Sequence, residues 1–100
     1  MAEVKWTKQA IKDVDNIAEF IANDSEHYAE LQVRRFFEAV KVLEHYPNSG
    51  KIVPEKNNES LREILQGNYR IIYRIVSDTI IDIVTVHHSK RLLSNNPHLK

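Results

Sequence analysis

The spacing of apolar residues changes once along this chain, and that change leaves few folds open to it. Before Pro47 the apolar residues recur every three or four positions, which is the spacing of helices that bury one face. After Ser60 they alternate with polar residues or form short runs rich in Ile, Val and Tyr, as in β-strands. The apolar faces of two helices must be buried, and the strands of the second half can form the layer that covers them.

The first half predicts a strand and a helical hairpin. Glu3–Trp6 has the alternation of a short strand, and Thr7 suits the N-cap of a helix that ends near Asn23. Asp24-Ser25 predicts a tight turn and a second helix cap, and Pro47 stops a second, longer helix. The first apolar stripe comprises Ala10, Ile11, Val14, Ile17, Ala18 and Ile21. The second comprises Tyr28, Val33, Phe36, Phe37, Val40 and Leu43.

The second half predicts a loop over residues 47–60 and then three strands. Gly67-Asn68 is the turn signal between the first two strands, and Ser77–Thr79 joins the second pair. The expected strands are Leu61–Leu65, Tyr69–Val76 and Ile80–His87. The prediction is an α+β fold in the order β-α-α-β-β-β, with the helical hairpin packed on one face of a small antiparallel sheet. The other face, called here the open face, then has no covering layer.

Composition limits the class of protein. One hundred residues suit a single domain, 1–100, whose tail at 89–100 is expected to be partly disordered. The chain has no cysteine and no long apolar run, so disulfides, cysteine-based metal sites and membrane spans are not expected. Adjacent His87 and His88 would point to opposite faces of a strand, which argues against a metal site. A cytoplasmic protein without a cofactor is the expectation.

The formal net charge is zero but unevenly distributed. Residues 1–59 hold eight Lys/Arg against eleven Asp/Glu, whereas residues 60–100 hold six against three. An anionic partner would therefore meet the C-terminal half. The overall neutrality argues against a protein that relies on phosphate contacts for its affinity.

Alternation along Tyr69–Val76 assigns side chains to the two faces. Tyr69, Ile71, Tyr73 and Ile75 form the more apolar set and should meet the helices. With a three-residue loop, the expected opposite pairs are Val76–Ile80, Ile75–Ile81, Arg74–Asp82, Tyr73–Ile83, Ile72–Val84 and Arg70–Val86. The same register places His88 on the open face with Arg70 and Arg74, and His87 on the helix side.

Arg70, Arg74 and His88 thus form a candidate cluster, with Lys90 and Arg91 beyond the strand end. One interpretation is a patch that binds an anion or transfers a phosphoryl group, with arginine holding the phosphate and histidine moving a proton. The other is structural: Arg74 pairs with Asp82, Arg70 pairs with a glutamate, and the histidine is solvated. The residues alone leave both open.

Several segments resemble one family of bacterial toxins. Val4–Ala10 resembles the family's opening, and Tyr46–Glu55 resembles its "P-x-x-G-x-x-V-P-E" loop. Leu61–Ile75 closely resembles the "REI-x-x-G-x-YRI-x-YR" strands, and a strand ending in Val86-His87-His88 follows. Together these segments resemble, over residues 3–91, the RelE/ParE superfamily toxins of type II toxin–antitoxin (plasmid stabilization) modules.

The resemblance implies one of two growth-inhibiting activities. ParE-like members are not enzymes; they bind DNA gyrase and trap its cleaved-DNA state. RelE-like members cut mRNA on the ribosome, and their YoeB branch uses a glutamate, the arginine that matches Arg70, and a histidine near the C-terminus. In that case Arg70 and His88 would be catalytic, but no glutamate can be placed.

The ParE-like activity is the preferred prediction, because the helices, loop and strands look most like that branch. An inactive homologue that only binds antitoxin is a further alternative. The resemblance also implies a small cognate antitoxin, whose acidic amphipathic segment would cover the basic end of the chain. Residues expected to bind the target or antitoxin are Arg62, Arg70, Arg74, His88, Lys90 and Arg91.

Overall fold

The computed structural model describes residues 1–89. The elements are β1 (Glu3–Trp6), α1 (Lys8–Ala22), α2 (Glu26–Ala39), a 3-10 helix η1 (Lys41–Glu44), β2 (Lys51–Ile52), β3 (Leu61–Gln66), β4 (Tyr69–Ser77) and β5 (Ile80–His88). The predicted α+β order is confirmed, with β2 and η1 as additions. The tail beyond Ser89, including Lys90 and Arg91, lies outside the described residues.

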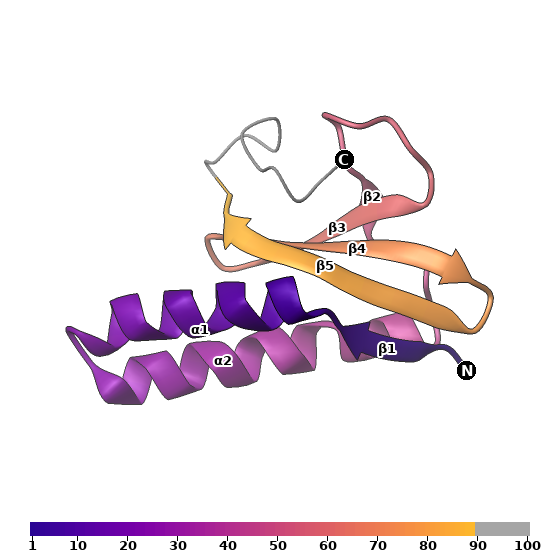
Figure 1. The fold of residues 1–100 in the computed structure, drawn as a ribbon. Coiled ribbons are helices and arrows are strands. Elements are labelled where there is room, and N and C mark those ends of the chain that lie inside the picture. The colour runs from indigo at the N-terminus through magenta and orange to yellow at the C-terminus, as the bar shows by residue number, and fades with distance from the viewer. Residues whose placement is uncertain (90–100) are drawn as a thin grey trace.

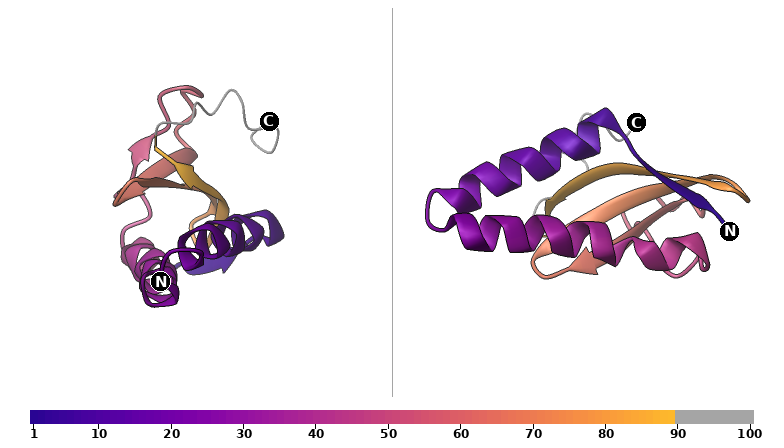
Figure 2. Two further views of the ribbon diagram at one scale, coloured as in Figure 1. Left: turned by 90° about the vertical axis from the view of Figure 1, so that its left-hand side faces the viewer. Right: turned by 90° about the horizontal axis from the view of Figure 1, so that it is seen from below.

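The two helices form an antiparallel hairpin beneath the sheet (Figures 1 and 2). Each begins at the predicted cap: the Thr7 side chain accepts from the backbone N–H of Ala10, and that of Ser25 from Tyr28. The second helix is shorter than predicted. It ends at Ala39, and the chain tightens into η1, which still buries Leu43. No helix within the described range is long and apolar enough to cross a membrane.

The sheet is mixed rather than wholly antiparallel. Its strand order is β1-β5-β4-β3-β2, and β1 runs parallel to β5 whereas the other pairs are antiparallel. The alternation in Glu3–Trp6 identifies a strand but carries no information about its direction. In Figure 1, β1 lies below the beginning of β5, at the right of the picture, and leads into the start of α1.

Two bulges change the register between β4 and β5. The predicted pairs Ile75–Ile81, Arg74–Asp82 and Tyr73–Ile83 are confirmed. The other three are wrong, because Val76 and Val84 each lie opposite no residue. The observed pairs there are Ser77–Ile80, Ile72–Thr85, Arg70–His87 and Tyr69–His88. The bulge at Val84 reverses the faces expected for the two histidines: His87 lies opposite Arg70, and His88 lies opposite Tyr69.

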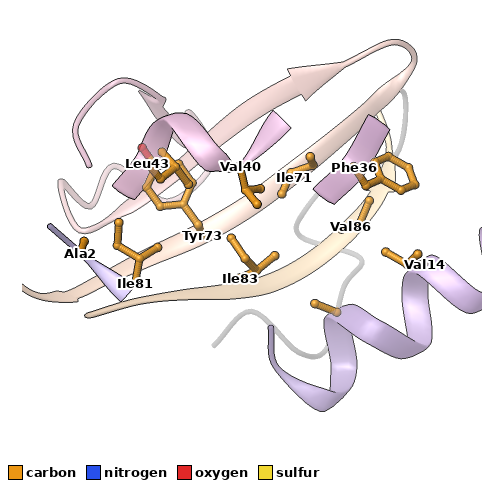
Figure 3. Packing of buried hydrophobic residues seen from close by; sticks show 11 residues of the cluster. Ala2, Val14, Phe36, Val40, Leu43, Ile71, Tyr73, Ile81, Ile83 and Val86 are labelled. Atoms are coloured by element: carbon orange, nitrogen blue, oxygen red, sulfur yellow. The ribbon is translucent and has the colours of Figure 1, made fainter. Parts of the chain in front are cut away.

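The main core lies between the helices and the sheet (Figure 3). Phe36, Val40 and Leu43 meet the β4 and β5 side chains Ile71, Tyr73, Ile81, Ile83 and Val86 there. The helix-facing set predicted for β4 belongs to this core.

The open face is less bare than predicted. Val53, Leu61 and Ile72 form a second, smaller buried cluster on it, with Val84 packed against them. Val53 belongs to the segment between β2 and β3, which rises above the sheet on the side away from the helices (Figure 1). This segment positions the candidate site.

Candidate functional site

Arg70 lies at the centre of the candidate site, bound to two carboxylates. Its Nε and Nη2 donate to Glu63 at 3.1 and 2.7 Å. Its Nη1 and Nη2 donate to Glu55 at 2.8 and 2.9 Å. The arginine is only 7% exposed. The expected pairing of Arg70 with a glutamate is therefore present, and the binding of an anion by the same arginine stays a prediction.

The two glutamates reach Arg70 from different elements. Glu63 is a β3 residue opposite Ile72, and Arg70 is opposite Leu65, so Glu63 and Arg70 are diagonal neighbours on one face. Glu55 comes from the loop after β2. Val53 anchors that loop through its burial and through a backbone hydrogen bond to Leu61 of 3.1 Å.

Tyr73 fixes the segment that leads into β2. Its hydroxyl donates to the Pro47 carbonyl at 2.6 Å and accepts from the Gly50 N–H at 3.0 Å. A Cβ on Gly50 would lie 2.6 Å from both the Glu63 carbonyl and the Tyr73 hydroxyl, so only glycine fits there. Burial raises the pKa of Tyr73 above its ordinary value, although the Gly50 hydrogen bond opposes that shift.

Arg62 contacts the two segments that flank β2. It lies opposite Tyr73, a helix-facing residue, and therefore does not join Arg70. Its guanidinium donates to the carbonyls of Glu59 at 2.9 Å and Gly50 at 3.0 Å. These contacts give Arg62 a structural role; a role in target or antitoxin binding stays a prediction.

Arg74 and His88, the other predicted site residues within 1–89, do not gather around Arg70. Arg74 is half-buried opposite Asp82, but no ion pair within 4.0 Å joins the two in the part of the chain that the structure describes. His88 is exposed on the helix side, its ring 5.8 Å from that of Tyr69. The prediction that His88 shares the open face with Arg70 is therefore wrong.

His87 is the histidine that lies opposite Arg70, and it is buried. Sequence reasoning missed it because the bulge at Val84 adds one residue to β5 and exchanges the two faces. An apolar valine fits either face, so the alternation gave no signal of the bulge. Glu55 was missed because its approach to Arg70 depends on the path of the loop.

The electrostatics of the site differ from those of a cationic patch. Arg70, Glu55 and Glu63 together carry one net negative charge. The hydrogen bonds that Arg70 donates to Glu55 raise the pKa of the arginine despite the opposing effect of burial, so the arginine stays charged. Beside these groups is a surface hollow of about 420 Å³. It is lined by Lys51, Pro54, Glu55, Glu63, Leu65, Arg70 and Ser89.

The carboxylate of Asp13 joins α1 to β5. Asp13 accepts from the Thr85 hydroxyl and from the Val86 N–H, the latter at 3.1 Å. Since β1 pairs with β5 only as far as Ile83, Asp13 provides an acceptor for the Val86 N–H on the strand edge beyond it. In the described range no group of three His, Cys, Asp or Glu could hold a metal ion.

With this geometry established, comparison with known proteins identifies the family. Residues 4–93 match the family described as the ParE toxin of the type II toxin–antitoxin system parDE. This chain belongs to the ParE toxin family. Membership implies an antitoxin partner, as the sequence resemblance predicted.

Relatives of this ParE-family toxin agree with the assignment. Toxin RelE2 of Caulobacter vibrioides is 30% identical over 92 residues, covering 92% of this chain and 100% of that toxin. The Sinorhizobium fredii protein Y4kP is 34% identical over 88 residues, covering 86% of each chain. A solved structure of the chromosomal ParDE toxin–antitoxin system from P. aeruginosa shares the fold. Its TM-score is 0.73 at 24% identity, over 90% of this chain and 98% of that one.

The loop motif that carried the family resemblance now has a physical explanation in this ParE-family toxin. Gly50 provides the space that Tyr73 needs, and Val53 anchors the segment in the smaller core. Glu55, the last residue of the motif, binds Arg70. The motif therefore builds and closes the Arg70 site.

Proposed function

We propose that this ParE-family toxin arrests growth by binding a protein target, DNA gyrase, and that a small cognate antitoxin neutralises it. The observation that carries the proposal is the state of Arg70, whose guanidinium is buried and bound by two carboxylates. A ribonuclease would need that cation for the phosphate in the transition state.

Local charge supports a protein target over cleavage of RNA. A phosphate approaching Arg70 meets Glu55 and Glu63, whose combined charge balances that of Arg70 and of Lys51 in the same hollow. Proteins that depend on nucleic acid usually neutralise several phosphates with Lys and Arg. With a formal net charge of zero, this toxin has no general basic excess to offer.

The decisive experiment exposes purified gyrase and a coupled translation mixture to the same toxin preparation. The expected result is loss of supercoiling with accumulation of cleaved DNA, while mRNA in the translation mixture stays intact. Toxin premixed with the protein encoded beside it should leave both systems unaffected. Codon-phased breaks in mRNA, with supercoiling unchanged, would overturn the proposal.

A ribosome-dependent mRNA endonuclease is the second candidate, and one observation favours it. Glu55 binds Arg70 directly, and His87 lies opposite Arg70 in register, so a glutamate, an arginine and a histidine belong to one face of the sheet. These are the residue types of the YoeB-like branch. If this candidate is right, Arg70→Lys and Glu55→Ala abolish mRNA cutting while both variants still fold. Neither the unsubstituted toxin nor the variants then inhibit gyrase.

A further inference from the structure

The guanidinium of Arg70 has two edges that can hold a carboxylate in a two-point grip, and the chain fills both. Glu63 occupies the edge formed by Nε and Nη2. Glu55 occupies the edge formed by Nη1 and Nη2. Because two parallel hydrogen bonds make the strong form of this contact, another anion can bind equally well only by displacing one of the two glutamates.

The two glutamates differ in how firmly they are held. The Glu63 side chain is 3% exposed and belongs to β3, which is paired on both sides at that residue. The Glu55 side chain is 24% exposed and belongs to a loop, two residues after its buried anchor Val53. Turning Glu55 outward breaks no strand pairing, so Glu55 is the displaceable ligand.

We propose that the outer edge of Arg70 is a carboxylate-binding site, held by Glu55 in the free chain and taken by an aspartate or glutamate of a protein partner. The partner's carboxylate takes the place of Glu55 and forms the same two hydrogen bonds. This inference rests on the proposed function only in that the partner is a protein, as an antitoxin is.

The surroundings favour a carboxylate on a protein over a phosphate of nucleic acid. Glu63 stays in place and already neutralises Arg70, so a strand of many phosphates gains little attraction there. Pro54 and Leu65 line the same hollow, and Leu65 is 56% exposed. An acidic side chain flanked by apolar ones matches a carboxylate site beside an apolar rim.

The resident Glu55 also sets the strength of binding. A ligand binds only the fraction of molecules in which the outer edge is vacant, and its apparent affinity falls by that fraction. Removing Glu55 should therefore strengthen carboxylate binding, although the loop loses a contact. If Glu55 competes with the ligand, its removal raises the affinity for carboxylate. If Glu55 only supports the site, its removal lowers that affinity.

The test follows the Arg70 side-chain Nε–H resonance by NMR in the free toxin, Glu55→Ala and Glu59→Ala. Glu59→Ala is the matched control because Glu59 lies in the same loop and contributes only its backbone carbonyl to Arg62. Each protein is titrated with sodium acetate and, separately, with dimethyl phosphate at constant ionic strength. Glu55→Gln replaces Glu55→Ala if thermal melts show that the alanine variant is unfolded.

In the Glu55 variant, acetate should shift the resonance with an apparent affinity about tenfold higher than in the unsubstituted toxin. Glu59→Ala should match the unsubstituted toxin. Equal affinity in all three proteins would overturn the proposal. If dimethyl phosphate bound as tightly as acetate, the partner would be a nucleic acid rather than a protein. Gyrase is absent, so neither outcome depends on the toxin's target.

Discussion

At the scale of single residues, Gly50 has no space for a side chain. An added methyl group would lie 2.6 Å from the Glu63 carbonyl and the Tyr73 hydroxyl, so the loop or Tyr73 must move. Gly50→Ala should lower the free energy of unfolding by about 1–3 kcal/mol, measured by urea denaturation. Ser49→Ala, at the exposed neighbouring position, should stay within about 0.5 kcal/mol of the unsubstituted toxin. If Gly50→Ala left the free energy of unfolding unchanged, the contact between Gly50 and Tyr73 would be looser than described.

Tyr73 gives a pH dependence whose sign can be worked out. Burial raises the pKa of its hydroxyl above the ordinary value of 10.0, so the unfolded chain loses this proton first as the pH rises. The contribution of Tyr73 to the free energy of unfolding is complete at pH values below its ordinary pKa. This contribution is lost as the pH rises through the pKa of the folded state. The stability difference between the toxin and Tyr73→Phe, from urea denaturation between neutral and alkaline pH, should therefore shrink at the alkaline end. A constant difference would contradict the assignment.

At the scale of elements, Asp13 is the polar link between α1 and β5. Removing its carboxylate leaves the buried Thr85 hydroxyl and the Val86 N–H without that acceptor. Asp13→Ala should cost about 1–3 kcal/mol in the free energy of unfolding. The control is Asp15→Ala, which changes an exposed aspartate on the same helix. Equal losses in both variants would show that helix charge, rather than the link to β5, is responsible.

Local signals explain which elements could be predicted. The helices begin at Thr7 and Ser25 because a side-chain cap acts within one turn, and apolar stripes mark the buried faces. The bulges at Val76 and Val84 leave no such mark, since valine fits either face of a strand. The candidate site depends on one of them: Arg70 was found from its motif, whereas its neighbour His87 was assigned to the wrong face. The pairing of Arg70 with Glu55 spans 15 positions and follows from the loop's path.

At the scale of the whole molecule, the sheet separates two cores of unequal size. Eleven buried residues pack on the helix face within the described chain, whereas Val53, Leu61 and Ile72 alone make up the buried part of the other cluster. Stability should therefore differ between the two sides, because segments with few buried apolar contacts open at lower free energy. The loop that carries Glu55 belongs to the weaker side.

Native-state hydrogen exchange measures this difference directly. The N–H groups of Lys56 and Asn57, both bonded to the Val53 carbonyl, should exchange through local opening. Those of Ile71 and Ile83, in the central strands, should exchange only on global unfolding, at a free energy at least about 2 kcal/mol higher. Glu55→Ala should lower the opening free energy of the loop and leave that of the strands almost unchanged. If the loop and the strands instead opened at one common free energy, the loop would belong to the same cooperative unit as the central strands, and the smaller core would not be the weaker side of the domain.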